Sequence, residues 1–445
     1  FAHLGHSRKY LMDDVLIRTL RESGLEVKHV INITDVGHLV SDDDSGEDKL
    51  EKGAKKYNMT AWEVAKQFEE AFWEMFTDLN LVTPTISCRA TDHIPEQIEL
   101  IQRLEQKGFT YLTEDGVYFD TSKLTDYGAL ARIQKEGLQA GARVDVAGKR
   151  SITDFALWKF SPKESKRDME WESPWGKGFP GWHIECSAMS MKYLGEQFDI
   201  HTGGIDHISI HHPNEIAQSE SATDKKPFVR HWVHHNFLLV DSQKMSKSLG
   251  NVYSIKDVKE KGFDPSAFKL LMLGTHYRKE INFTWESLKG AQTAFDRLIQ
   301  LLQTFRSEQE RTTLSSEKLE KIDEYRNRFL TAIQNDLNTP EALVVFWEVT
   351  KSNIPGQDKY DLLCEFDRFF GLNLAEKSTQ DTHLISRVSL KDLPDEIKQL
   401  AKDRAKFKLS GEYAKADEAR AKIELAGWSV IDTAEGEPYF QKQSN

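Results

Sequence analysis

The sequence contains few cysteines, lacks an excess of positive charge and has no long apolar run. Its three cysteines, Cys88, Cys186 and Cys364, are too widely spaced to indicate a disulfide framework, so we expect a reducing, cytoplasmic location. A formal net charge of −12 argues against indiscriminate coating of nucleic acid, although a local basic face could still bind RNA. No apolar run is long enough to span a bilayer and no signal peptide is recognisable, so we expect no membrane partner.

The composition is that of a folded protein with more than one domain. At 445 residues, the chain exceeds the usual length of a single domain. A hydrophobic content of 39%, with 10 Trp and 24 Phe, supports buried cores and excludes a generally disordered polymer. The chain opens inside a motif described next, so we expect that its native N-terminal segment is missing.

Two short motifs, far apart in the chain, carry groups suited to phosphate. Residues 244–251 place Lys244 and Lys247 three positions apart among hydroxyl groups. Near the start, His3 and His6 flank Gly5, which lets a ligand approach the backbone closely. Each motif alone could be an ordinary solvated turn or a pair of surface histidines. Together they predict a site in which both segments meet across one nucleotide.

The residues after His6 follow the order of an α/β nucleotide-binding fold. An amphipathic helix is predicted over Tyr10–Ser23, and a β-branched strand over His29–Asp35. Helix then strand favours a doubly wound parallel sheet, in which ligands bind beyond the carboxyl ends of the strands. Thr34 and Asp35 would lie at such an end, with a simple turn as the alternative.

The remaining pattern divides the chain into six regions. Further helices are predicted over 60–79, 95–108, 255–273, 285–305, 316–335, 340–352, 359–370 and twice within 394–426, with a hairpin over 111–119, strand-like pieces at 143–146 and 155–158, and a short terminal tail. The regions are the first half of the nucleotide-binding catalytic domain (1–119), an α+β connective insertion (120–175), the second half of the catalytic domain (176–253), a helical region (254–310), a helical bundle (311–380) and a C-terminal region (381–445).

Residues 176–222 are the densest in metal-ligating groups. Cys186, His211 and Glu215 offer a thiolate, an imidazole and a carboxylate, all acceptable to zinc. If a helix begins at Pro213, His211 and Glu215 could converge on one ion. The alternative is a buried free cysteine with a capping His/Glu pair, because structural zinc sites usually show closely spaced pairs of Cys or His.

Several motifs together resemble the cysteinyl-tRNA synthetase family. The segments 3–6 and 244–251 match the HIGH and KMSKS motifs of all class I aminoacyl-tRNA synthetases. Gly-Trp-His-Ile-Glu-Cys-Ser-Ala-Met (181–189) and His-His-Pro-Asn-Glu-Ile-Ala-Gln-Ser (211–219) are similar to the cysteine family in particular, as are residues 139–146 and 336–340. The resemblance covers nearly the whole chain. It implies an α/β, Rossmann-like catalytic domain followed by an all-α C-terminal helical bundle.

The resemblance also implies roles for single residues. Cys186, His211 and Glu215 match the family's zinc ligands, while the remaining ligand is a cysteine upstream of the HIGH motif, absent from this sequence. Whether this chain alone retains zinc therefore stays open. The other matches are Thr34, Trp182 and His201 in the amino-acid pocket, Gly204 and Asp206 at adenosine, and His3, Gly5, His6, Lys244 and Lys247 at the ATP phosphates. The chain departs from the family at Ser209-Ile210 and Pro213, which lie beside the metal residues but spare them.

The reaction that the resemblance implies is cysteine–tRNA ligation. The cysteine carboxylate would attack the α-phosphorus of ATP with Mg²⁺, and the adenylate would pass cysteine to the 3′ end of tRNA-Cys. One Zn²⁺ per chain would bind the substrate thiol and distinguish it from a hydroxyl. We expect a monomer, with residues 254–310 contacting the tRNA stem and residues 381–445 binding the anticodon.

Basic residues concentrate near the C-terminus of this otherwise acidic chain. They are Lys398, Lys402, Arg404, Lys406, Lys408, Lys415, Arg420 and Lys422. Phe407, Tyr413 and Trp428 lie nearby and could stack on bases. A solvated helix face with paired charges explains the same pattern equally well.

Two other functions are compatible with the same site. A cysteine ligase of mycothiol-type biosynthesis would pass cysteine to an amino-sugar, but such ligases end soon after the first helical region, whereas this chain continues through Trp428. A catalytically inactive, synthetase-like binding protein would not need Lys244, Lys247, His3, His6 and Cys186, all of which are present.

Overall fold

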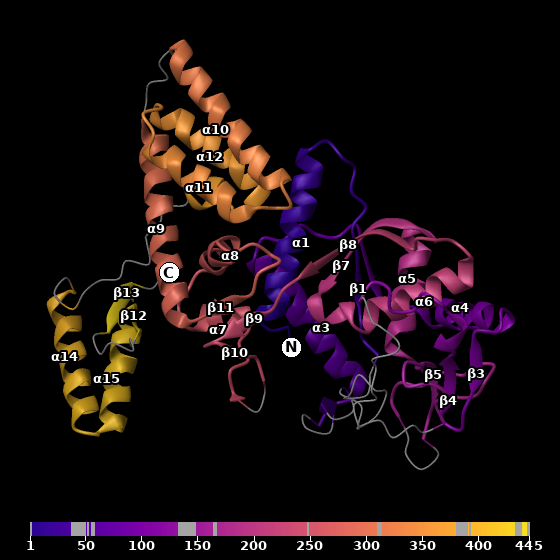
Figure 1. Ribbon diagram of the computed structural model, residues 1–445. Coiled ribbons are helices and arrows are strands. Elements are labelled where there is room, and N and C mark those ends of the chain that lie inside the picture. The colour runs from indigo at the N-terminus through magenta and orange to yellow at the C-terminus, as the bar shows by residue number, and fades with distance from the viewer. Residues whose placement is uncertain are drawn as a thin grey trace.

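The computed structural model describes residues 2–36, 50, 53–54, 58–131, 148–162, 167–246, 249–308, 314–379, 390, 393–431 and 438–442. In Figure 1, the catalytic α/β region, the bundle of α10–α12 and the terminal unit of α14 and α15 form separate lobes, with α1 between the first two. Among the described residues, no helix is both long and apolar enough to cross a membrane.

Helix α1 (Leu4–Glu22) begins at the first motif, earlier than the sequence predicts. The predicted start was Tyr10, but His3 caps the helix: its side chain accepts a hydrogen bond from the Gly5 N–H, and the His6 ring accepts one from the His3 N–H. Polar capping groups of this kind satisfy N–H groups that a helix start leaves free. The first motif is therefore the N-terminus of a helix.

Two pairs of parallel strands form the α/β part of the catalytic region, for which the sequence predicted a doubly wound sheet. Strand β1 (Val30–Ile33) pairs with β2 (Ile86–Arg89), and β7 (Phe198–Gly204) pairs with β8 (Val229–His235). Each pair is joined by a crossover helix, α3 (Ala61–Asp78) or α6 (His211–Thr223). Strands β1 and β7 both border a cavity of about 800 Å³. Their carboxyl ends open onto the pocket described below, which confirms the α/β, Rossmann-like prediction.

An antiparallel sheet follows in the order β3-β4-β5-β6. Its strands are β3 (Thr110–Leu112), β4 (Gly116–Phe119), β5 (Phe155–Phe160) and β6 (Gly178–Pro180). The predicted hairpin over 111–119 is confirmed as β3 and β4, whereas the predicted strand at 143–146 lies outside the described residues. A Cβ at Gly178 would lie only 2.0 Å from the Lys159 carbonyl oxygen, so the last strand needs glycine to approach β5.

Of the helices that flank this sheet, α4 was predicted from the sequence and α5 was not. Helix α4 (Ile94–Gln106) lies before it, and α5 (Trp182–Leu194) follows β6 directly. Short 3-10 helices span Thr91–His93, Thr121–Lys123 and Ile205–Ile208. Helix α5 packs on both α4 and α6, so the side chains of α5 and α6 face one another near the ends of the parallel strands.

The predicted single helix over 255–273 is wrong. The structure has α7 (Ile255–Glu260) and α8 (Pro265–Leu273), because Gly262 adopts a φ of 81° and Asp264 caps a new helix that starts at Pro265. A small mixed sheet lies beside them in the order β10-β9-β11. Its strands are β9 (Leu238–Val240), β10 (Gln243–Lys244) and β11 (Ile281–Phe283).

The C-terminal half is helical, as predicted, and ends in a hairpin that the sequence did not predict. Its helices are α9 (Trp285–Ser307), α10 (Ser316–Gln334), α11 (Thr339–Lys351), α12 (Gly356–Phe370), α13 (Leu374–Lys377), α14 (Asp395–Leu409) and α15 (Tyr413–Leu425). Strands β12 (Trp428–Ile431) and β13 (Tyr439–Lys442) pair where a tail was expected. Val430 and Phe440 are buried against α14 and α15, which gives the hairpin a core.

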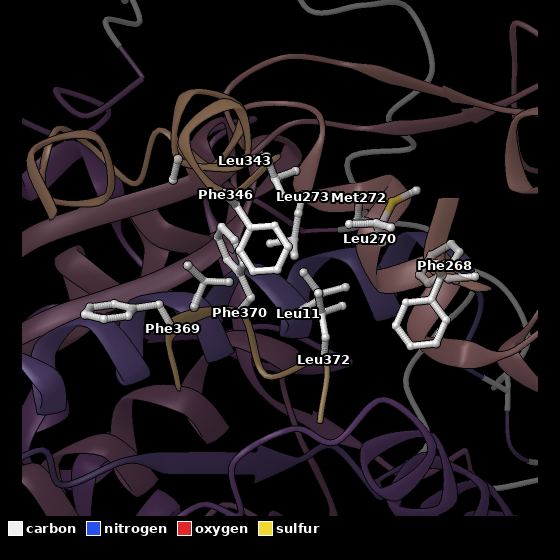
Figure 2. Packing of buried hydrophobic residues seen from close by; sticks show 14 of the residues in the cluster. Leu11, Phe268, Leu270, Met272, Leu273, Leu343, Phe346, Phe369, Phe370 and Leu372 are labelled. Carbon is white, nitrogen blue, oxygen red and sulfur yellow. The ribbon is translucent and has the colours of Figure 1, made fainter. Parts of the chain in front are cut away.

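One hydrophobic core joins the catalytic region to the bundle. Leu11 of α1, Leu273 of α8, Phe346 of α11 and Phe370 of α12 belong to the same cluster (Figure 2). Beside it, the Lys269 ammonium donates to the Asp14 carboxylate at 2.9 Å, with both side chains 1% exposed. Helix α1 is therefore held on one side by the parallel strands and on the other by the bundle.

Replacing Phe346 by Ala should lower the free energy of unfolding by about 3–5 kcal/mol, because a buried ring is lost and a cavity remains. The matched control is Val344→Ala on the same helix, where the side chain is 55% exposed and the change should stay below about 0.5 kcal/mol. Denaturant unfolding followed by circular dichroism measures both values. Equal losses from the two variants would contradict the shared core.

Candidate functional site

The two phosphate motifs predicted from the sequence lie in contact. A Cβ added at Gly5 would meet the Met245 methyl carbon and the His3 ring, each at 3.0 Å. The Leu4 N–H also donates to the Tyr253 carbonyl oxygen at 2.8 Å, just past the second motif. Both motifs line one pocket of about 710 Å³. Glycine at position 5 leaves space for the Met245 methyl group beside the end of the helix.

The histidines of the first motif place their free ring nitrogens at this pocket. His3 accepts from the Gly5 N–H through Nδ1 at 3.1 Å, and His6 accepts from the His3 N–H through Nδ1 at 3.2 Å. A neutral imidazole whose Nδ1 accepts carries its proton on Nε2 and can donate from it. Both rings line the pocket beside the N-terminus of α1, where the helix dipole also favours an anion.

Lys244 comes from β10 and its ammonium lies 4.7 Å from the centre of the Phe237 ring. The backbone around it is braced by Asn251, which accepts from the Ser246 N–H at 2.8 Å and donates to the Lys244 carbonyl oxygen at 3.2 Å. The sequence motif contains Asn251 but did not predict this bracing. Lys247, the second predicted lysine, lies outside the described residues.

Residues at the ends of β1 and β7 also line the pocket. Thr34 follows β1, while Gly204 ends β7 and Asp206 lies directly beyond it. A Cβ at Gly204 would lie 2.2 Å from an Asp206 carboxylate oxygen, so the Asp206 side chain lies directly against the end of β7. Asp35, in contrast, accepts from both the backbone N–H and the hydroxyl of Thr91, which fixes the loop after β1 to the residues after β2.

The predicted metal residues converge. One ligand atom each from Cys186 of α5 and from His211 and Glu215 of α6 lies within 4.8 Å of the other two. His211 and Glu215 are four residues apart on one helix face, and the His211 Nε2 atom lies 3.1 Å from a Glu215 oxygen. The other His211 nitrogen, Nδ1, is 2.8 Å from His183 Nδ1, a contact that orients the ring.

Electrostatics in this cluster favour a bound cation. Burial opposes ionisation of Glu215, but His201 and His211 together outweigh it and hold the pKa of this carboxyl well below its ordinary value. Burial, followed by the nearby Glu215 and Glu185 carboxylates, raises the pKa of the Cys186 thiol well above its ordinary value. A thiol beside a buried carboxylate loses its proton readily only when a metal compensates the charge. The donor set and its spacing therefore fit zinc.

A second group of possible ligands shares Glu215. His201, His212 and Glu215 also have ligand atoms within 4.8 Å of one another. His212 Nδ1 lies 2.8 Å from His234 Nε2, while His212 Nε2 is buried and has no hydrogen-bond partner among the described residues. The sequence did not predict His212 or His234 as site residues. His212 directly follows His211, and only the fold shows that the two rings face different neighbours.

The predicted amino-acid pocket residues line the same cavity. His201 Nε2 lies 3.0 and 3.2 Å from the two Glu215 oxygens. The Trp182 ring centre lies 4.5 Å from that of His211, so the indole covers one side of the metal residues. The structure thus brings together every predicted site residue that it describes: His3, Gly5, His6, Thr34, Trp182, Cys186, His201, Gly204, Asp206, His211, Glu215 and Lys244.

Comparisons with known proteins agree in one family. A family model described as the tRNA synthetases class I (C) catalytic domain matches residues 1–293. The chain is 47% identical to Cysteine--tRNA ligase 1 of Burkholderia lata, across 99% of this chain and 89% of that protein. It is 42% identical to the Cysteine--tRNA ligase of Treponema denticola, across 98% and 91%.

Similarity to solved structures extends to other synthetases at the level of the fold. A Mycobacterium tuberculosis methionyl-tRNA synthetase in complex with methionyl-adenylate matches with a TM-score of 0.59 and 17% identity, covering 85% of this chain and 89% of that chain. An Agrobacterium radiobacter LeuRS in a ternary complex matches with a TM-score of 0.59 and 12% identity, covering 85% and 84%.

The contact between the two motifs can be tested directly. Gly5→Ala should shift the ¹³C-methyl NMR resonance of Met245, because the new Cβ would lie 3.0 Å from that methyl carbon. The matched control is Gly290→Ala in α9, where an added Cβ meets no atom within 4 Å and Met245 should be unaffected. An unchanged Met245 signal in folded Gly5→Ala protein would show that the motifs do not touch.

Proposed function

Because the chain belongs to the cysteine–tRNA ligase family of class I synthetases, and so joins L-cysteine to tRNA at the expense of ATP, we propose how its residues divide this work. The main support is the convergence of both phosphate motifs and a thiol-compatible metal cluster on one pocket. No observation favours transfer to an amino-sugar or a catalytically inactive protein.

The phosphates of ATP would lie between the two motifs. His3 and His6 donate from Nε2 to phosphate oxygens, and Gly5 leaves room for the nucleotide against the helix end. Lys244 and Lys247 neutralise the leaving pyrophosphate together with Mg²⁺. Gly204 and Asp206 hold the adenosine at the end of β7, in the same pocket.

The amino acid would lie deeper, beside the metal residues. Thr34, Trp182 and His201 form its pocket, and Cys186, His211 and Glu215 hold one Zn²⁺. When bound, zinc supplies a soft cation that prefers a thiolate to a hydroxyl. Trp182 covers the metal residues and limits access of water, while His201 is held in place by its hydrogen bond to Glu215.

The chain needs no nucleophile of its own for this reaction. The carboxylate of cysteine attacks the α-phosphorus of ATP and expels pyrophosphate, and the terminal ribose hydroxyl of the tRNA then takes the cysteinyl group and releases AMP. Catalysis comes from positioning and from charge stabilisation by the two motifs. Burial lowers the pKa of the His3 imidazole, which favours its neutral form. A neutral His3 can donate a hydrogen bond to a phosphate oxygen without adding a positive charge to the site.

The C-terminal regions would bind the tRNA. We assign residues 254–310 to the stem, 311–380 to the helical bundle and 381–445 to the anticodon, where α14 and α15 carry the basic residues. Several of these pair locally, for example Lys415 with Glu412 and Arg420 with Glu424, so only part of the positive charge is available to RNA. A monomeric state and a cytoplasmic location stay predictions.

Lys247→Ala and Lys244→Ala should each lower cysteine-dependent ATP–pyrophosphate exchange by about 100-fold or more, because each removes a cation from the leaving group. Lys256→Ala, on the exposed surface of α7, is the control and should exchange at the wild-type rate. Near-normal exchange by Lys247→Ala would show that the loop assignment is wrong. Adding tRNA or an amino-sugar to the wild-type assay identifies the acceptor.

Cys186→Ser should abolish stoichiometric zinc in the full-length protein, measured by inductively coupled plasma mass spectrometry. Cys364→Ser, a thiol on α12 far from the pocket, should keep it. His212→Gln separates the two candidate groups, since it should retain zinc if Cys186, His211 and Glu215 form the site. Zinc kept by Cys186→Ser and lost by His212→Gln would move the ion to the second group.

A further inference from the structure

Arg8 lies two residues after His6 on α1 and makes an unusual set of contacts. Its side chain is almost fully buried, with the residue 1% exposed. The guanidinium donates to four backbone carbonyl oxygens and does not line the pocket. The donor–acceptor distances are 2.8 Å to Asn236, 2.6 Å to Phe237, 3.4 Å to His276 and 2.5 Å to Lys279.

These four carbonyl groups come from two segments that lead into one small sheet. Asn236 and Phe237 connect β8 to β9, and His276 and Lys279 lie in the turn between α8 and β11. The two segments are also joined to each other, because the Asn236 N–H donates to the Tyr277 carbonyl oxygen at 2.9 Å. Arg8 is therefore hydrogen-bonded both to the segment that precedes β9 and to the segment that precedes β11 in the β10-β9-β11 sheet.

That sheet carries half of the proposed phosphate site. Strand β10, which ends at Lys244, pairs with β9, and the Phe237 ring lies under the Lys244 ammonium. The other half, His3 and His6, is on the same helix as Arg8. A single buried side chain thus connects the helix that bears the histidines to the segment that leads to the lysine.

We propose that Arg8 is a positioning residue that sets the distance between His3–His6 and the Lys244 hairpin, and thereby the affinity for the ATP phosphates. The proposal rests on the function proposed above. Guanidinium suits this task because it presents several N–H donors in a fixed plane, whereas a lysine ammonium is a single point on a flexible stem. Burying a guanidinium cation is costly unless its hydrogen bonds to the carbonyl oxygens are made. The position of Arg8 therefore fixes the positions of these carbonyl groups, which a side chain that only filled space would not do.

The test compares Arg8→Lys with Arg18→Lys in the full-length protein. Arg18 is on the same helix and also donates to a backbone carbonyl oxygen, that of Asn80, but its other partner is the Asp14 carboxylate and neither partner belongs to a motif. In ATP–pyrophosphate exchange, Arg8→Lys should raise KM for ATP by about tenfold, with KM for cysteine within about twofold of wild type. Arg18→Lys should leave both KM values unchanged.

Several outcomes would overturn the proposal. Unchanged KM for ATP in Arg8→Lys, or a fall in kcat that only follows the fraction of active sites, would show a structural role alone. If Arg8→Lys does not fold, Arg8→Gln is measured instead, because its single amide nitrogen cannot donate to all four carbonyl oxygens that the guanidinium contacts. This variant should raise KM for ATP about threefold or more, and an unchanged value rejects the proposal.

The same assay separates this proposal from the proposed function. If Lys244→Ala impairs exchange but Arg8→Lys does not change KM for ATP, the Arg8 role is rejected while the proposed ATP site stands. If Lys244→Ala exchanges normally, the phosphate-site assignment itself is wrong, and the Arg8 role falls with it.

Discussion

The contact between the N-terminus of α1 and the segment that follows β10 is the interaction on which the site depends. The Leu4 N–H donates to the Tyr253 carbonyl oxygen, and Gly5 leaves space for the Met245 methyl group and the His3 ring. That contact brings a hairpin from the second half of the catalytic region onto a helix from the first half. The phosphate-binding groups are therefore assembled by close backbone approach, and the His3 and His6 rings serve both as caps of the helix and as walls of the pocket.

Buried charged residues of α1 reinforce this arrangement. Asp13 accepts from the Lys9 ammonium at 2.6 Å and lies 2.8 Å from His235 Nε2, at the end of β8. Burial opposes ionisation of Asp13, yet Lys9 and His235 outweigh it and lower the pKa of its carboxyl. Arg8 and Asp14 are buried on other faces of the same helix, where Arg8 donates to carbonyl groups around β9 and Asp14 accepts from Lys269 of α8. Breaking any one of these buried charged contacts would be costly, because it leaves a charge without its partner.

Much of the fold could be predicted from local sequence patterns, whereas only part of the site could be predicted in this way. Helix α3, the hairpin of β3 and β4, and the break between α14 and α15 follow from apolar spacing, capping residues and glycine. The start of α1 was missed because histidine is a rare cap, and the break at Gly262 because apolar spacing continues across it. The role of Arg8 could not be read from the sequence, since its partners are backbone carbonyls more than two hundred residues away. Cys186, His211 and Glu215 were predicted from residue types and a family resemblance, whereas the unpartnered His212 nitrogen appears only in three dimensions.

The hydrophobic core shared by α1, α8, α11 and α12 limits where the chain can be divided into independent domains. The match to the catalytic-domain family ends at residue 293, inside α9, yet Phe295, Leu298 and Leu302 of that helix are buried in the same cluster as Leu11. A boundary drawn by sequence similarity therefore crosses the interior of a cooperative unit. Replacing the bundle by that of another protein would therefore require a matching apolar face on α1 and α8.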